Sequence, residues 1–139
     1  MLKRTPLFAT HQKLGGKLIE FGGWEMPVQY TSITDEHLAV RNAAGIFDIS
    51  HMGEVTVSGS AAATFLNGVL TNDIRKLSAG AGQYSLLCNE RGGTIDDLYV
   101  YCLSKEVYLL VVNASRTEAD VAWLQQRAAD TFCNRRRLS

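Results

Sequence analysis

Residues 92–112 read GGTIDDLYVYCLSKEVYLLVV, which is typical of two consecutive strands. Two glycines open the stretch, the run over 94–103 carries β-branched and aromatic residues, and a polar turn leads into the apolar run over 107–112. Because the second run is apolar throughout, we expect an interior strand that is buried on both faces. A third strand over 83–88, joined through a hairpin loop over 89–93, makes the group antiparallel.

The rest of the chain adds helices and further strands around these three. The predicted elements are a short helix opened by Thr5-Pro6 and closed at Gly15-Gly16, a strand over 17–21, a structured loop over 22–27, a helix over 36–42 after a capping box at Ser32, strands over 46–50 and 54–58, a helix over 61–70 capped by Ser60, and a helix from a capping box at Ser115 to about Ala129. This order predicts an α+β fold, a mostly antiparallel sheet with flanking helices. Only polar and basic residues follow the last helix, so we expect an unpaired, incomplete sheet edge through which the chain could self-associate.

The composition is that of a globular protein and argues against several classes. Lys+Arg and Asp+Glu number 14 each, so the formal net charge is zero and there is no broad basic surface for nucleic acid. No apolar run approaches the ~20 residues that a membrane span needs, so we expect no membrane partner. Cys88, Cys102 and Cys133 are an odd count without a C-x-x-C pair, which predicts reduced thiols.

Two adjacent carboxylates, Asp96 and Asp97, lie in an apolar strand, where charged side chains are rare. Because strand side chains alternate, Asp97 shares a face with Tyr99 and Tyr101, whereas Asp96 points to the opposite face and is expected to accept from a backbone amide near the hairpin. A carboxylate beside two aromatic rings suits a flat, nitrogen-rich ligand, and Tyr84 on the neighbouring strand could approach the same face. The alternative, in which both acids cap turns or pair with arginines, fits the spacing equally well.

Other polar residues give weaker signals. Residues 48–51 combine an acid, a hydroxyl and an imidazole, but no G-x-S-x-G elbow is present, and His51 is predicted to be a hydrogen-bonded structural residue. The three histidines lack metal-ligand spacing and no glycine pair forms a phosphate cradle, so neither a metal nor a nucleotide cofactor is predicted. A group that could line a pocket or anchor its loop consists of Trp24, Met26 and Tyr30.

Six collinear motifs carry a family resemblance. They are TPLF at 5–8, FGGWEMP at 21–27, GIFDISHMGE at 45–54, TND at 71–73, YS at 84–85 and GGTIDDLYV at 92–100. Together they resemble the aminomethyltransferase, or T-protein, family of the glycine cleavage system, from about Leu2 to Arg127. Members of that family are more than twice as long, with three domains around a central folate channel, so the resemblance is to the N-terminal portion only.

The resemblance implies an enzyme that takes the aminomethyl group from the S-aminomethyldihydrolipoyl arm of the H-protein, releases ammonia and passes the one-carbon unit to tetrahydrofolate. It implies that Asp97 is catalytic, because a fixed carboxylate would stabilise the iminium-like centre formed as ammonia leaves. Met52, Tyr84, Tyr101 and Asn113 match pocket positions of the family. With Tyr99, which shares the Asp97 face, the predicted folate-binding set is Met52, Tyr84, Asp97, Tyr99, Tyr101 and Asn113.

The resemblance also implies a domain division and competing hypotheses. Residues 1–50 would be the N-terminal segment of the first folate-binding domain, 51–129 a partial second α+β domain, and 130–139 a divergent polar and basic tail. The alternative function is a truncated, non-catalytic folate-binding or interaction fragment of the same family. Folate-dependent paralogues, including an iron-sulfur assembly factor and the dimethylglycine and sarcosine oxidases, share parts of this fold. The expected location is the cytoplasm of a bacterium or the mitochondrion of a eukaryote, with no clear transit peptide in the chain.

Overall fold

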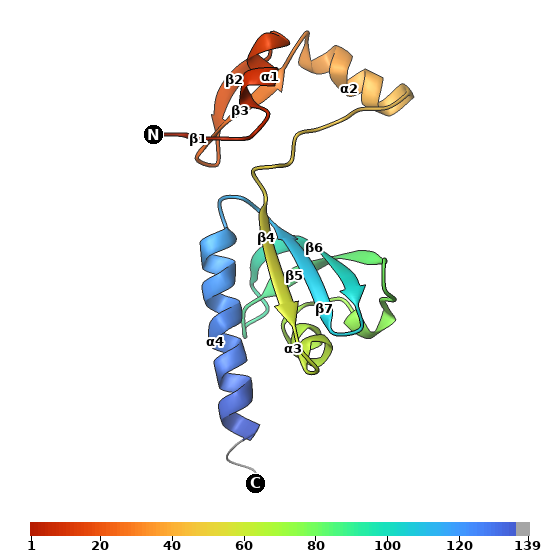
Figure 1. Ribbon diagram of the computed structural model, residues 1–139, viewed down its shortest axis with the longest axis vertical. Helices are drawn as coiled ribbons and strands as arrows, with labels where there is room; N and C mark the ends of the chain where they lie inside the picture. Colours follow the sequence, from red (N-terminus) through yellow and green to blue (C-terminus); the bar gives the residue numbers. More distant parts are fainter. Residues whose placement is uncertain (136–139) are drawn as a thin grey trace. The chain divides into compact units, whose positions relative to one another are not determined.

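In the computed structural model the chain divides into two units, Met1–His51 and a second unit that begins at Met52 (Figure 1). The structure describes the backbone of residues 1–135 and the side chains of residues 1–129. Both units combine helices with a mainly antiparallel sheet, which confirms the predicted α+β class.

The first unit is a three-stranded sheet with two helices. Its elements are β1 (Lys3–Arg4), α1 (Phe8–Lys13), β2 (Lys17–Phe21), β3 (Trp24–Gln29) and α2 (Ile33–Asn42). β3 lies in the middle, parallel to β1 and antiparallel to β2. The loop predicted over 22–27 is wrong, because Gly22 (φ +58°) and Gly23 (φ +86°) form a tight turn and the strand begins directly after it. Pro27 is tolerated where the register of the pair shifts.

Of the two helices of the first unit, only α2 begins at a side-chain cap. The Ser32 hydroxyl accepts from the Asp35 amide at 3.1 Å, so the predicted capping box and its helix are confirmed. Thr5 does not cap α1, which begins at Phe8, because the Thr5 hydroxyl donates instead to Asp48 at 2.7 Å. The strand predicted over 46–50 is also wrong. This segment is irregular, and its Asp48 carboxylate hydrogen-bonds with Thr5 and His11.

The second unit is a four-stranded antiparallel sheet with order β4-β7-β6-β5. Its elements are β4 (Gly53–Ser58), α3 (Ala62–Val69), the 3₁₀ turn η1 (Ile74–Lys76), β5 (Gly82–Cys88), β6 (Thr94–Ser104), β7 (Val107–Val112) and α4 (Thr117–Arg135). All four strands were expected at these places, and the predicted hairpin loop over 89–93 connects β5 to β6. β7 is an interior strand, as its apolar sequence predicts, whereas β4 and β5 form the edges.

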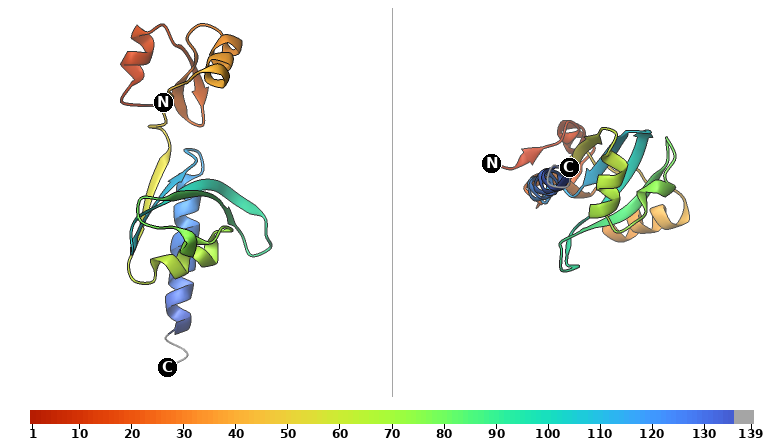
Figure 2. Two further views of the ribbon diagram at one scale, coloured as in Figure 1. Left: turned by 90° about the vertical axis from the view of Figure 1, so that its right-hand side faces the viewer. Right: turned by 90° about the horizontal axis from the view of Figure 1, so that it is seen from below.

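Helices α3 and α4 cover the same face of this sheet, and the core lies beneath them (Figure 2). It contains Ala62, Leu66, Leu70, Ile74, Leu87, Leu98, Val100, Cys102, Tyr108, Leu110, Val112 and Leu124. The prediction that β7 is buried on both faces is wrong for this chain: Tyr108, Leu110 and Val112 are buried, but the alternate residues are only half-buried. Both helices pack on one side, which leaves the opposite face of the sheet open among the described residues.

The ends of the helices in the second unit differ from the sequence prediction. Ala61, which has no side-chain cap, precedes α3, so Ser60 is not its cap. α4 begins at Thr117, whose hydroxyl donates to the carbonyl of Asn113 at 3.1 Å, and it continues to Arg135 instead of ending near Ala129. Of the tail predicted over 130–139, the backbone to Arg135 therefore belongs to α4, and residues 136–139 lie outside the described part.

Two further expectations concern the state of the cysteines and the presence of a membrane-spanning helix. Cys88 is half-buried and Cys102 is buried, and both are free thiols, whereas the Cys133 side chain lies outside the described residues. Within residues 1–135, none of the helices combines the length and the apolar character needed to cross a membrane.

Candidate functional site

The two acids of β6 lie on opposite faces of the sheet, as the alternation predicts. Asp96 is only 6% exposed and shares the helix-covered face with the buried Leu98. Asp97 is exposed on the open face, in the same row as Tyr99 and Tyr101. The two carboxylates therefore have different environments.

The open face brings Tyr84 to Asp97, as predicted. β5 pairs with β6 so that Tyr84 lies opposite Tyr99, and the Tyr84 hydroxyl donates to Asp97 Oδ2 at 3.2 Å. This hydrogen bond crosses from one strand to the next and holds one carboxylate oxygen.

The rings of Tyr99 and Tyr101 lie together beside this carboxylate. Their centroids are 5.0 Å apart and the planes are inclined by 37°. Both rings lean over Gly82 of β5, where an added Cβ would lie 2.6 Å from Tyr101 Cδ1 and 2.8 Å from Tyr99 Cε1. A glycine at this position therefore makes room for the two aromatic rings, which form a partly exposed aromatic surface.

Asn113, directly after β7, links the two acids. Its side-chain amide donates to Asp97 Oδ1 at 3.0 Å and to Asp96 Oδ1 at 2.9 Å, and its backbone amide donates to Asp96 Oδ2 at 3.1 Å. Asp96 thus accepts from a backbone amide, but that amide belongs to Asn113 and not to the hairpin as predicted. The alternative was that both acids cap turns or pair with arginines. Asp96 does accept from the backbone amide of the turn after β7. The partners of Asp97 in the described chain are Tyr84 and Asn113, so pairing of Asp97 with an arginine is not supported.

Met52 lies at the same end of the sheet. It precedes Gly53, which pairs with Val112, so the register places Met52 near the level of Asn113. Its side chain is half-buried. Of the six predicted site residues, Tyr84, Asp97 and Asn113 are joined by hydrogen bonds, Tyr99 and Tyr101 lie in the next rows, and Met52 lies at the neighbouring strand end.

The electrostatics of the open face keep Tyr84 a donor. Desolvation by its surroundings, its hydrogen bond to Asp97, and the charges of Asp97 and Asp96 all raise the pKa of the Tyr84 phenol above its ordinary value. The phenol therefore stays protonated at neutral pH and can donate to Asp97.

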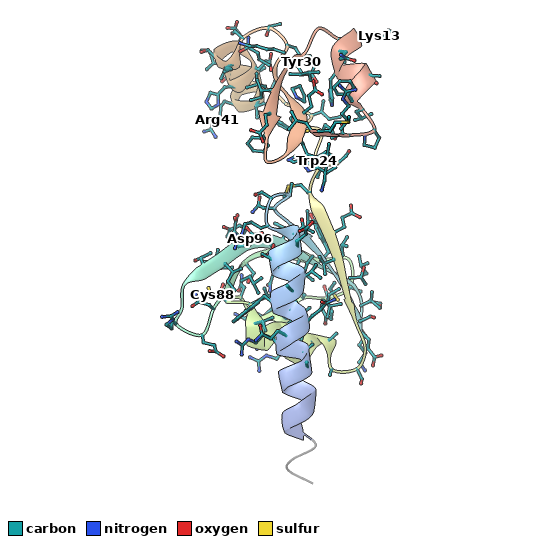
Figure 3. All side chains as sticks on the ribbon, turned by 90° about the vertical axis from the view of Figure 1, so that its left-hand side faces the viewer. Lys13, Trp24, Tyr30, Arg41, Cys88 and Asp96 are labelled. Carbon is teal, nitrogen blue, oxygen red and sulfur yellow. The ribbon has the colours of Figure 1, made fainter. Side chains whose placement is uncertain are left out.

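Asp120, on the buried side of α4, is a residue that the sequence analysis missed. Its side chain is fully buried, and burial together with the hydrogen bond and charge of Asp96 raises its pKa to about 7, against a smaller opposite effect of Arg116. Figure 3 shows Asp96 beside the beginning of α4. The available signal was an acid four residues before the core residue Leu124, on the helix face that also carries apolar residues.

A second polar cluster, in the first unit, is structural. Asp48 Oδ2 lies 2.8 Å from His11 Nε2, and His11 Nδ1 lies 2.6 Å from the Tyr30 hydroxyl. Burial acts to raise the pKa of Asp48, but hydrogen bonds from His11, Ser50 and Thr5 outweigh it and hold the pKa well below its ordinary value. The cluster ties the segment around Asp48 to α1 and β3.

His51 does not join this cluster, so no Ser-His-Asp triad forms. Its ring lies edge-on to Phe21 and Trp24, with centroids 5.9 and 6.4 Å away, and its Nδ1 has no hydrogen-bond partner in the described structure. The prediction that His51 is held by hydrogen bonds is therefore wrong, because ring packing holds it. Met26 is buried and Tyr30 hydrogen-bonds with His11. For the group of Trp24, Met26 and Tyr30, these contacts favour packing and anchoring over the lining of a pocket.

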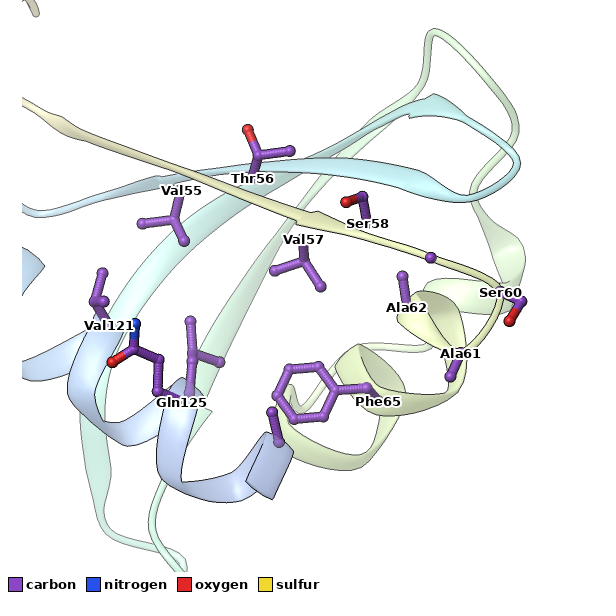
Figure 4. A pocket seen from close by; sticks show the side chains of 13 residues that line it. Val55, Thr56, Val57, Ser58, Ser60, Ala61, Ala62, Phe65, Val121 and Gln125 are labelled. Carbon is purple, nitrogen blue, oxygen red and sulfur yellow. The ribbon is translucent and has the colours of Figure 1, made fainter. Parts of the chain in front are cut away.

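A pocket of about 480 Å³ lies on the helix-covered side of β4 (Figure 4). It is lined by residues of β4, α3 and α4, including Val55, Val57, Phe65, Val121 and Leu124, and none of its lining side chains is ionisable. It lies on the face opposite Asp97 and is therefore separate from the candidate site. Within the described residues, no three His, Cys, Asp or Glu side chains are grouped so that they could hold a metal ion.

The second unit is thus an α+β arrangement whose open sheet face presents an anchored carboxylate beside two phenol rings. The family model described as "GCVT N-terminal domain" matches residues 7–139, and the chain belongs to this family. Two similar curated proteins are both named "Aminomethyltransferase". The one from Geobacillus kaustophilus is 58% identical over 124 residues, 89% of this chain and 34% of that protein. The one from Bacillus subtilis is 54% identical over 129 residues, 93% of this chain and 36% of that protein.

A solved structure supports the same family. The crystal structure of glycine cleavage system aminomethyltransferase T from Bartonella henselae matches with a TM-score of 0.85 and 43% identity, over 92% of this chain and 36% of that one. The chain thus resembles the N-terminal portion of these proteins and spans about a third of the length of the curated relatives it matches.

Proposed function

We propose that the chain carries part of the tetrahydrofolate site of an aminomethyltransferase. The reaction is transfer of the one-carbon unit from the S-aminomethyldihydrolipoyl arm of the H-protein to tetrahydrofolate, with release of ammonia. The observation that carries the proposal is the Asp97 carboxylate, held by Tyr84 and Asn113 beside two exposed aromatic rings. The similarity to proteins named aminomethyltransferase supports the reaction class.

The chemistry of the open face suits a reduced pterin. A pterin is flat and rich in N–H groups, so Tyr99 and Tyr101 can contact its face while Asp97 accepts from its edge. Asn113 and Tyr84 fix the carboxylate, and the Met52 thioether offers an adaptable apolar contact at the strand end. In this proposal Met52, Tyr84, Asp97, Tyr99, Tyr101 and Asn113 bind the folate, and Asp97 is catalytic.

Asp97 also supplies the charge that the reaction needs. A folate nitrogen attacks the methylene carbon as ammonia leaves, and the carbon–sulfur bond then breaks, which returns the dihydrolipoyl thiol. The one-carbon centre thereby becomes cationic and iminium-like on the folate nitrogen. A carboxylate that is already oriented by two donors stabilises this charge without reorganising, which can contribute several kcal/mol. Binding the folate and the aminomethyl arm side by side supplies the orientation.

The direct test is ammonia release from aminomethylated H-protein by the 139-residue chain, measured with and without tetrahydrofolate. Ammonia release that depends on tetrahydrofolate supports the enzyme. The second candidate function is a folate-binding or interaction fragment without turnover. Folate binding with no ammonia release would establish that second function.

The partners belong to the same proposal. The H-protein would present the lipoyl arm, and the amount of aminomethylated H-protein consumed in the ammonia assay tests its use directly. Self-association through an incomplete sheet edge stays a prediction, with β4 and β5 as the edges of the sheet. Sedimentation equilibrium of the chain tests it.

A further inference from the structure

Behind the open face, two buried carboxyl groups face each other. Asp120 of α4 is 0% exposed and Asp96 of β6 is 6% exposed. The Asp96 carboxyl acts on that of Asp120 through hydrogen bonding and through its charge. Among the described side chains, no N–H or O–H donor reaches either Asp120 oxygen. A hydrogen bond between two carboxyl groups requires a proton on one of them.

The surroundings of the pair determine which carboxyl holds this proton. Asp96 accepts from the backbone and side-chain N–H groups of Asn113. Asp120 receives no comparable donor, so burial favours its neutral form. Arg116, which directly precedes α4, is the cation that opposes this effect, and Asp96 is the anion that reinforces it.

We infer that Asp120 is a positioning residue for Asp97, which it reaches through Asp96 and Asn113. The Asp120 proton holds Asp96 in place, Asp96 Oδ1 holds the Asn113 amide at 2.9 Å, and the same amide holds Asp97 Oδ1 at 3.0 Å. The route crosses the sheet, from the helix-covered face to the open face. Its relevance to catalysis rests on the proposed folate site, whereas the link itself is a property of the chain alone.

This link has a consequence for pH dependence. When Asp120 loses its proton, two anions face each other in a buried space, and Asp96 must move away or take up the proton itself. Either change alters the acceptor that holds the Asn113 amide. The orientation of Asp97 therefore changes as Asp120 ionises.

The first experiment follows the carboxyl and amide signals of the wild-type chain by NMR from pH 5 to pH 9. We expect one carboxyl of the Asp96–Asp120 pair to titrate close to neutral pH, far above the usual range for aspartate. The side-chain amide signals of Asn113 should shift with the same midpoint. If both carboxyls are ionised throughout this range, or if the Asn113 signals do not change with them, the inference is overturned.

Variants of Asp120 separate the effect of its proton from the effect of its side-chain packing. Asp120→Asn supplies an N–H donor that cannot ionise, so the Asn113 signals should stay at their low-pH position throughout. Asp120→Ala removes the donor, so the signals should be displaced at every pH. Glu118→Gln changes an exposed carboxylate on the same helical turn and should leave the Asn113 signals as in the wild type. If Asp120→Ala does not fold, the wild-type titration and the Asp120→Asn variant still show whether the Asp120 proton controls the Asn113 signals.

Tetrahydrofolate binding connects the link to the proposed function. We expect wild-type affinity to fall by about fivefold between pH 6 and pH 8, the effect of one hydrogen bond of ordinary net strength, and Asp120→Asn to abolish this dependence. A chain that shows the coupled NMR titration but binds no tetrahydrofolate would contradict the proposed function and leave the positioning link intact. Tetrahydrofolate binding with equal pH dependence in wild type and Asp120→Asn would overturn the role assigned to Asp120.

Discussion

Tyr84 reaches Asp97 diagonally across two strands, with its hydroxyl 3.2 Å from Asp97 Oδ2. In the register, Tyr84 lies opposite Tyr99, and the residue opposite Asp97 is Leu86. Diagonal neighbours on one face of an antiparallel pair are within reach of a long aromatic side chain. The hydrogen bond therefore fixes the carboxylate and also depends on the register of β5 against β6.

Replacing Tyr84 with Phe removes this donor and keeps the ring. We expect a weaker hold on Asp97 and a loss of roughly 1 kcal/mol in tetrahydrofolate binding, measured by calorimetry, because Asn113 still donates to the other oxygen. The matched control is Tyr99→Phe, which removes a hydroxyl that makes no side-chain hydrogen bond in the described structure. Equal losses in the two variants would contradict the role of the Tyr84 hydroxyl.

Replacing Asp97 with Asn neutralises the charge and keeps the shape. We expect tetrahydrofolate binding to persist, while folate-dependent ammonia release falls by about 10²- to 10³-fold, the usual cost of losing one preorganised electrostatic group. Glu54→Gln removes a charge from the exposed face of β4, the face that Asp97 also occupies, and should leave the rate unchanged. Undiminished ammonia release by Asp97→Asn would refute the catalytic assignment.

Replacing Gly82 with Ala tests the aromatic surface. The new Cβ would lie 2.6 Å from Tyr101 and 2.8 Å from Tyr99, so the two rings must turn away. Because the rings are partly exposed and can move, we expect the fold to persist and tetrahydrofolate binding to weaken by roughly 1 kcal/mol as the aromatic pair is disturbed. Near-ultraviolet circular dichroism should report the ring movement.

Gly68→Ala is the control for this substitution, because a Cβ there meets nothing within 4 Å. In the last turn of α3 it should raise the free energy of unfolding by less than about 1 kcal/mol and leave binding unchanged. Unaltered tetrahydrofolate binding by Gly82→Ala would argue against a role for the paired rings.

Much of this site follows from local sequence, because it depends on alternation. The period of two along β6 is enough to place Asp96 and Asp97 on opposite faces, and the hairpin between β5 and β6 is enough to bring Tyr84 to the Asp97 face. In both cases the information is carried by neighbouring residues and one short turn.

The parts of the fold and the site that local sequence does not predict depend on contacts between distant segments. The Asn113 side chain binds residues 16 and 17 positions earlier, and Asp120 meets Asp96 only because α4 packs on the sheet. The irregular segment around Asp48 is held by His11, which lies 37 positions away. The alternating pattern of residues 46–50 therefore predicts a strand that does not form. Such pairings are decided by tertiary packing, which local periodicity does not contain.

The pH dependence of stability provides another prediction. The pKa of Asp120 is raised from 3.8 to about 7 in the folded chain, so between these values the folded state holds a proton that the unfolded state has lost. The contribution of Asp120 to the free energy of unfolding of the second unit should therefore be fully present below about pH 4, fall as pH rises to about 7, and then level off. Asp48, whose pKa is lowered, contributes stability to the first unit above pH 3.8 that is lost only in stronger acid, so it does not vary over this range.

Urea unfolding at pH 5 and pH 8 measures this effect. Trp123 fluorescence reports the second unit and Trp24 the first. The wild type should be more stable at pH 5 by the Trp123 signal, and Asp120→Asn should lose most of this difference. A second unit that is more stable at pH 8 would contradict the protonated state of Asp120.

Ligand-induced stabilisation tests whether the second unit alone recognises folate. All six proposed binding residues lie in the unit that begins at Met52, so tetrahydrofolate should stabilise that unit directly. At one hundred times the dissociation constant the gain is about 2.7 kcal/mol, which should raise the midpoint of thermal unfolding by several degrees. A Trp24→Phe variant leaves Trp123 as the single tryptophan reporter, so that the shift can be assigned to the second unit. Asp97→Asn should keep the shift, because it is expected to bind, whereas a cooperative transition that tetrahydrofolate does not move would show that these residues do not form a folate site in this chain.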